Sequence, residues 1–148
     1  MKNTIAERVA DFLKRYPPFQ FLAADSLLQI AAQVQVLYFE KDKAIFKEKD
    51  TNHSMFYVVK DGAVRVFRTV DNQPKIADIC DEGDIFGLRP LITKEDYELS
   101  ASANEESIIY GIPIDLFLPI ALEHKEVSNF LIASKPDPSE EFINKKFA

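Results

Sequence analysis

The stretch Met55-Phe56-Tyr57-Val58-Val59-Lys60-Asp61-Gly62-Ala63-Val64-Arg65-Val66-Phe67-Arg68 decides the class of fold. Two runs rich in Val, Phe and Tyr flank the dipeptide Asp61-Gly62. β-Branched and aromatic residues favour strands, and Asp-Gly is a strong signal for a tight turn between paired strands. The stretch therefore predicts a β-hairpin across Asp61-Gly62 in a mainly β protein.

Short strands predicted by the same pattern continue on both sides, over residues 36–112. Asp71-Asn72-Gln73-Pro74 and Asp81-Glu82-Gly83-Asp84 have the composition of turns. Leu99-Ser100-Ala101-Ser102-Ala103 alternates apolar and polar residues, as a half-buried strand does, and Ser107 to Ile112 forms the last strand. Evenly spaced short strands predict a sandwich, a barrel or a jelly roll.

The segments before and after this β region predict helices. Apolar residues recur at helical spacing from Ile5 to Leu13, and Pro17-Pro18 ends that helix. Asp25 or Ser26 is expected to cap a second helix, and helical spacing returns after Pro113. We divide the chain into N-terminal helices (1–35), a β core (36–112), C-terminal helices (113–134) and a tail (135–148) whose composition is typical of a linker.

Composition limits the class of protein. The chain has 148 residues, enough for one domain with a hydrophobic core. Its net charge of -6 argues against a nucleic-acid partner, because proteins that bind nucleic acids usually present a basic surface. The N-terminus lacks the apolar core of a signal peptide, and no stretch approaches the roughly 20 apolar residues that span a bilayer. We expect a cytoplasmic protein that does not contact a membrane.

Residue types that carry catalysis or metal binding are scarce. His53 and His124 lie far apart in predicted elements of different kinds, so they are interpreted as surface residues and not as a metal site. Cys80 is the single cysteine, lies in an apolar run and has no histidine nearby, which favours a buried position over a nucleophile. We therefore predict no catalytic residues, no metal, no cofactor and no enzymatic activity.

Three stretches carry a resemblance to a known family: Phe39 to Asp50, Met55 to Val66, and Glu82 to Gly87. Together they resemble the cyclic-nucleotide-binding domain, typified by catabolite activator proteins and regulatory subunits of protein kinases. The resemblance covers residues 19–132. It implies a double-stranded β-helix, or jelly roll, flanked by N- and C-terminal helices, and a regulatory module that senses a ligand. Asp42 and Lys49 replace two glycines of the family pattern.

The family's binding cassette is degenerate in this sequence. The family pattern reads Phe-Gly-Glu-x-Ala/Ser-Leu, followed several residues later by Arg-Ala/Ser-Ala. Leu88 stands in place of the glutamate, Pro90 in place of the small residue, and Tyr97 in place of the arginine. The resemblance nevertheless implies candidate ligand-binding residues in and after this cassette: Phe86, Gly87, Leu88, Arg89, Pro90, Leu91, Tyr97, Leu99 and Ser100.

These replacements change the chemistry that a cyclic phosphate needs. Its negative charge is bound by an arginine and by backbone N–H groups, and proline has no N–H. An unpaired buried charge costs about 3–5 kcal/mol, and a missing partner for the ribose about 1–3 kcal/mol. Together these costs correspond to a loss of at least about a thousandfold in affinity for a cyclic nucleotide. We therefore expect no cyclic AMP binding of the usual kind, unless Arg89 replaces the lost arginine.

Two functions stay open at this point. In the first, the domain binds a small molecule other than cyclic AMP, such as another nucleotide, in a cavity between Leu88, Tyr97 and Ser100. In the second, Tyr97 fills that space and the fold serves dimerisation through the C-terminal helices or contact with another domain. The cassette also resembles that of bacterial signal-transduction proteins in which this fold precedes paired CBS domains and a nucleotidyltransferase. That resemblance implies domains after residue 148.

Overall fold

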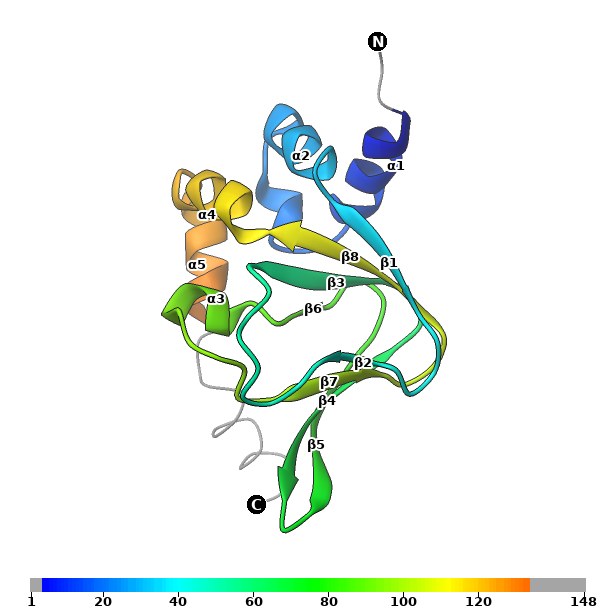
Figure 1. Cartoon of the computed structure of the whole chain (residues 1–148). Helices are drawn as coiled ribbons and strands as arrows, with labels where there is room; N and C mark the ends of the chain where they lie inside the picture. Colours follow the sequence, from blue (N-terminus) through cyan, green and yellow to red (C-terminus); the bar gives the residue numbers. More distant parts are fainter. Residues whose placement is uncertain (1–3, 134–148) are drawn as a thin grey trace.

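The structure is a computed structural model that describes residues 4–133. Two antiparallel sheets face each other, and helices cover one of them (Figure 1). The strands are β1 (Gln35–Phe39), β2 (Ala44–Phe46), β3 (Met55–Asp61), β4 (Val64–Val70), β5 (Gln73–Cys80), β6 (Ile85–Phe86), β7 (Ser100–Ala103) and β8 (Ser107–Pro113). The helices are α1 (Thr4–Leu13), the 3-10 helix η1 (Phe19–Phe21), α2 (Ala24–Ala31), α3 (Arg89–Thr93), α4 (Ile114–Leu122) and α5 (Lys125–Ala133).

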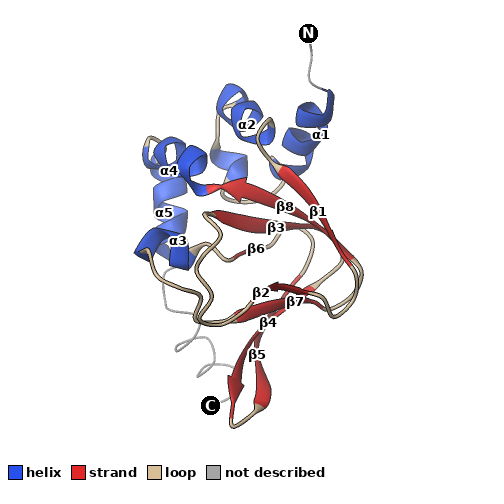
Figure 2. Cartoon of the chain, viewed as in Figure 1, coloured by secondary structure: helices blue, strands red, loops and turns tan. Residues whose placement is uncertain are grey.

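The strand order defines a helix-flanked β-roll. One sheet has the order β1-β8-β3-β6 and the other β2-β7-β4-β5. Figure 2 shows the helices gathered on the side of the first sheet, whereas the outer face of the second sheet carries no helix among the described residues. The predicted jelly roll with flanking helices is confirmed. The proposed linker-like tail lies outside the described residues.

The predicted hairpin across Asp61-Gly62 is wrong. β3 pairs with β6 and β8, whereas β4 pairs with β5 and β7, so the two strands belong to different sheets. Gly62 adopts φ +99°, and a Cβ there would collide with the Ser107 hydroxyl. The Ser107 Oγ accepts a hydrogen bond from the Ala63 N–H at 3.1 Å. Asp61-Gly62 therefore does form a turn, but this turn connects a strand of one sheet to a strand of the other.

Two further local expectations differ from the structure. The hairpin that does form joins β4 to β5 through Asp71 and Asn72, both at positive φ (52° and 63°), which is the conformation of a type I′ turn. Gln73 already belongs to β5. The second helix begins at Ala24 and has Ala23 at its N-cap, without a side-chain cap. Asp25 therefore lies in the first turn, where its charge favours the helix dipole.

Alternation along β3 builds two separate hydrophobic clusters. Phe56 and Val58 face the helices and join the cluster that we call the helical core. Tyr57 and Val59 face the opposite way, into the cluster between the two sheets that we call the roll interior. Full burial of such side chains stabilises the fold by about 1.5–3 kcal/mol each. Cys80 is buried in the roll interior, as its apolar surroundings predicted.

The helical core ties the ends of the domain to the β1-β8-β3-β6 sheet. Phe12 of α1, Phe117 of α4 and Val127 of α5 are completely or nearly completely buried there. Phe117 packs edge-on against Phe56, with ring centroids 4.8 Å apart. No helix of the described part has the length and hydrophobicity of a bilayer-spanning segment. The C-terminal helices are therefore packed on the same sheet whose other face lines the roll interior.

Asp42 and Lys49, where the resemblance implies glycine, have the left-handed backbone conformation that glycine favours. Their φ angles are 71° and 73°, in the left-handed region that L-residues adopt at a cost. The Lys49 N–H donates to the Tyr97 carbonyl oxygen at 2.7 Å, and Asp42 forms an ion pair with Arg65 at 3.1 Å. Tertiary contacts therefore hold both residues in a conformation that glycine would adopt more easily.

We predict that Lys49→Gly raises the free energy of unfolding by about 0.5–1 kcal/mol, because glycine removes the cost of the left-handed conformation. Urea unfolding monitored by circular dichroism measures the change. Lys47→Gly is the matched control: Lys47 lies two residues away and has no positive φ, so glycine there should lower stability. Destabilisation of similar size in both variants would contradict the argument.

Candidate functional site

Tyr97 lies inside the roll, where the cassette was predicted to bind a ligand. It follows α3 and precedes β7, and its side chain is 2% exposed. Its N–H donates to the Asp50 carbonyl oxygen at 3.0 Å, and its own carbonyl accepts from the Lys49 N–H. Both backbone groups of Tyr97 are thus fixed to the segment that follows β2.

The Tyr97 ring stacks face to face on Phe46. The two ring centroids are 3.9 Å apart and the ring planes differ by 6°. Phe46 also contacts the rings of Tyr57 and Phe86, with centroid distances of 6.1 Å to each. Tyr57 and Phe86 are 5.3 Å apart. Four aromatic rings thus occupy the roll interior beside the cassette. Each close aromatic pair stabilises the fold by about 0.5–1.5 kcal/mol beyond the effect of burying its surface area.

The tyrosine hydroxyls inside the roll are satisfied by the chain itself. The His53 N–H donates to the Tyr97 hydroxyl oxygen at 3.1 Å. The His53 Nδ1 and the Tyr57 hydroxyl form a hydrogen bond of 2.6 Å. Burial raises the pKa of Tyr57 above its ordinary value of 10.0, and the neighbouring Tyr97 hydroxyl raises it further; burial likewise raises the pKa of Tyr97. Both hydroxyls are therefore neutral at physiological pH.

Gly87 allows the cassette to approach these rings closely. Its φ is +76°, and a Cβ would lie 3.1 Å from a Phe46 ring carbon and 3.2 Å from a Tyr57 ring carbon. Such separations are tighter than ordinary contacts, so a larger residue would push the rings apart. The glycine retained from the family pattern therefore packs against aromatic side chains of this chain.

The remaining cassette residues lie elsewhere. Leu88 and Leu91 pack against the helical core, on the other side of the sheet from Tyr97. The cassette helix α3 starts at Arg89, and Pro90 is its second residue, near the helix start where proline is tolerated. Arg89 and Pro90 are partly exposed. Leu88 thus contributes to helix packing and not to the wall of an interior cavity.

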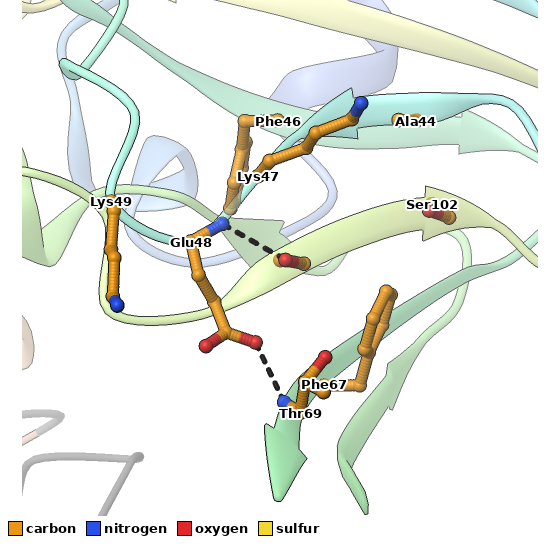
Figure 3. A pocket seen from close by; sticks show the side chains of 9 residues that line it. Ala44, Phe46, Lys47, Glu48, Lys49, Phe67, Thr69 and Ser102 are labelled. Carbon is orange, nitrogen blue, oxygen red and sulfur yellow. Dashed lines mark hydrogen bonds between the residues drawn. The ribbon is translucent and has the colours of Figure 1, made fainter. Parts of the chain in front are cut away.

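Ser100 lies on the outer face of the second sheet. It lines a depression of about 390 Å³ together with Ser102 and Phe67 (Figure 3). The neighbouring Ala101 points the opposite way, into the roll interior, where Leu99 also packs. The cavity of the first alternative, between Leu88, Tyr97 and Ser100, is absent because the three side chains face three different spaces. Phe86, Gly87, Tyr97 and Leu99 are the predicted site residues that come together.

Phe46, Tyr57 and His53 are the members of this arrangement that sequence reasoning missed. Phe46 and Tyr57 belong to predicted strands, but alternation alone does not tell which face of a strand meets the cassette. His53 is exposed, as expected, yet it binds both tyrosines. Among the described residues no group of three or more potential metal ligands is found.

The family is established by comparison with known sequences. Residues 36–124 match the model of the cyclic nucleotide-binding domain, which is more than half of the chain. The chain therefore belongs to the cyclic-nucleotide-binding domain family. No curated protein sequence matches it.

Solved structures share the fold at low sequence identity. The sensor domain of the transcriptional regulator DNR from Pseudomonas aeruginosa is 18% identical, with a TM-score of 0.77 and 87% of each chain covered. The regulatory subunit of a cAMP-independent protein kinase A from Trypanosoma cruzi, bound to guanosine, is 20% identical with a TM-score of 0.80. The corresponding subunit from Trypanosoma brucei is 19% identical with a TM-score of 0.79.

This chain spans about half of the two trypanosome subunits. The superposition covers 95% of this chain but 49% of the Trypanosoma cruzi subunit, and 97% against 53% for the Trypanosoma brucei subunit. The fold of this chain therefore corresponds to about half of each of those subunits.

We predict that Tyr57→Phe weakens the loss of stability above pH 10. Below pH 10 the Tyr57 hydroxyl is protonated in both the folded and the unfolded chain, so it causes no pH dependence. Above pH 10 the unfolded chain ionises first, because the folded pKa is raised, and the free energy of unfolding falls by up to about 1.36 kcal/mol per pH unit for each such group.

Urea unfolding at about pH 9, 10.5 and 11.5 measures this effect, with pH values chosen around the ordinary tyrosine pKa. Tyr38→Phe is the control. A hydrogen bond to Glu106 also raises the pKa of Tyr38, but this side chain is 57% exposed, so solvent screens the effect and the variant should change the decline less than Tyr57→Phe does. A decline of equal steepness in the wild type and in Tyr57→Phe would contradict the buried, hydrogen-bonded state of Tyr57.

Proposed function

We propose that this chain is a regulatory domain, not a catalyst, that keeps the cyclic-nucleotide-binding fold but acts without cyclic AMP. One observation carries the proposal: Tyr97, at the position of the family's arginine, is 2% exposed and stacks on Phe46 in the roll interior. An uncharged ring of the chain itself thus lies where the family pattern supplies a cation for the cyclic phosphate.

The chemistry around Tyr97 supports this proposal. A cyclic phosphate that entered the roll would meet aromatic rings and neutral hydroxyls, and Leu88, in place of the ribose-binding glutamate, is directed to the helical core. Burial of an unpaired charge costs several kcal/mol, and displacement of the Tyr97 ring would add the cost of lost packing. Both costs oppose binding of cyclic AMP and cyclic GMP.

The cassette and the C-terminal helices share one hydrophobic cluster, which supports a regulatory role. Leu91 of α3, Phe117 of α4 and Val127 of α5 belong to the same buried cluster. A change in the position of α3 would therefore alter the packing of α4 and α5 in this cluster. We propose that these helices contact a second copy of the chain or a further domain, whether of the CBS and nucleotidyltransferase kind or another. The longer trypanosome subunits support such a place within a larger protein.

A second candidate is a domain that binds an uncharged nucleoside. The similarity to a cAMP-independent kinase subunit bound to guanosine favours it. A nucleoside has no phosphate, so the missing arginine would not penalise it. It would still have to displace the Tyr97 ring, whose hydroxyl and backbone are hydrogen-bonded. For that reason we prefer the regulatory domain whose interior is filled by its own side chains over the nucleoside-binding domain.

A thermal-shift series tests the proposal with cyclic AMP, cyclic GMP and guanosine, each at millimolar concentration. A ligand at a hundred times its Kd stabilises a protein by about 2.7 kcal/mol, which raises Tm by several degrees. We expect no rise in Tm with either cyclic nucleotide, in the wild type or in Arg89→Ala.

A rise in the Tm of the wild type with cyclic AMP that Arg89→Ala abolishes would overturn the proposal and identify Arg89 as the phosphate anchor. A rise with guanosine alone would favour the nucleoside-binding domain instead. Lys94→Ala is the matched control for Arg89→Ala, because Lys94 is an exposed cation that immediately follows α3.

A further inference from the structure

A depression on the outer face of the second sheet has the composition of a ligand site. Its volume is about 390 Å³, within the roughly 300–1,000 Å³ of small-molecule pockets. β2, β4 and β7 and the segment after β2 supply its walls (Figure 3). This surface lies on the opposite side of the sheet from Tyr97, so it is separate from the site of the proposed function.

Two serine hydroxyls form the floor of the depression. Ser102 is 6% exposed, and its hydroxyl makes no hydrogen bond within the described part of the chain. No fully inaccessible side-chain oxygen in that part lacks a partner, so the Ser102 Oγ is reached from the depression. Ser100 is 8% exposed and accepts the Glu48 N–H at 2.9 Å, which leaves its own proton free to be donated. The floor therefore offers two O–H donors.

The charged groups around this floor favour an anion. Lys47 and Lys49 are exposed cations of the lining. The Glu48 carboxylate lies between them in sequence, and one of its oxygens accepts the Thr69 N–H at 2.7 Å. Figure 3 shows Lys47 extending along the sheet toward Ala44, whereas the Glu48 side chain is directed toward Thr69. The lining thus carries an excess of one positive charge, and its carboxylate is partly engaged.

The remaining wall is apolar. Phe67 of β4 pairs with Ser100, and Ala44 of β2, which has no polar side-chain group, pairs with Ser102; both line the depression. A phenyl wall beside hydroxyl and ammonium donors suits a flat apolar body that carries an oxyanion group. A bare inorganic anion would leave the phenyl wall uncovered.

We propose that this outer face binds a small molecule in which an oxyanion group is attached to a flat apolar body, as in an aryl carboxylate or an aryl phosphate. The Ser100 and Ser102 hydroxyls and the Lys47 ammonium bind the oxyanion, and Phe67 packs on the flat body. The ligand is recognised by groups that the family's interior cassette does not contain.

Two contacts connect this site with the roll interior. Phe46 lines the depression and also stacks on Tyr97. The Lys49 N–H donates to the Tyr97 carbonyl oxygen. A ligand that steadies the segment from Phe46 to Lys49 therefore also steadies the residue that fills the interior. The outer site can in this way act as the input of a domain whose inner site is closed.

Titration of the full chain with benzoate and with phenyl phosphate, followed by amide chemical shifts, tests the site. We expect saturable shifts at Lys47, Lys49, Thr69, Ser100 and Ser102, and an approximately fivefold to tenfold weaker Kd in Ser102→Ala and in Lys47→Gln. Lys43→Gln is the matched control, since Lys43 is an exposed lysine immediately before β2 and outside the lining. The two probes distinguish a carboxylate from a phosphate as the preferred oxyanion.

If no amide shift saturates at ligand concentrations up to about 20 mM, the proposal is wrong. It is also wrong if Lys43→Gln loses as much affinity for the ligand as Lys47→Gln does. If sodium chloride at the same ionic strength causes equal amide shifts, the shifts arise from charge screening and the proposed site is wrong. Failure of this test leaves the closed interior untouched, because the thermal-shift series with cyclic nucleotides probes the other face of the sheet.

Discussion

The stack of Tyr97 on Phe46 is the contact on which the arrangement of this domain depends. It joins the segment after α3 to the segment after β2, which are distant in sequence and are also linked by backbone hydrogen bonds between Tyr97, Lys49 and Asp50. In a roll that receives an anionic ligand, the two sheets need a buried cation between them. In this roll the rings of Tyr97 and Phe46 pack between the sheets, so the interior is stabilised by packing of uncharged side chains.

The cassette contributes apolar area to the helical core. Leu91 is buried in that cluster, and Leu88 packs against it. Positive φ angles occur at Gly87 and also at Asp42 and Lys49, the two positions where the resemblance implies glycine. The left-handed backbone at these loops therefore does not require a glycine at each position.

The sequence predicted the jelly roll, its flanking helices and most strands, because period-two alternation and turn residues are local signals. It failed at Asp61-Gly62: the same dipeptide closes a hairpin or redirects a chain between sheets, and only the long-range pairing of β3 with β8 and of β4 with β7 decides between them. The site was predicted in part. The replacement by Tyr97 was visible, but the position of its ring depends on Phe46, Tyr57 and His53, which no local pattern connects to it.

The two faces of the β2-β7-β4-β5 sheet explain why Ser100 was placed in the wrong space. Successive residues of β7 alternate between faces, so Ala101 and Ala103 are directed inward, while Ser100 and Ser102 are directed outward. Small residues inside leave room for the rings of Phe46 and Tyr97, and hydroxyls outside remain available to a polar ligand. A strand of four residues thus separates an apolar, self-filled interior from a polar outer depression. Its alternation therefore places the proposed outer site and the packed aromatic rings on opposite faces of one sheet.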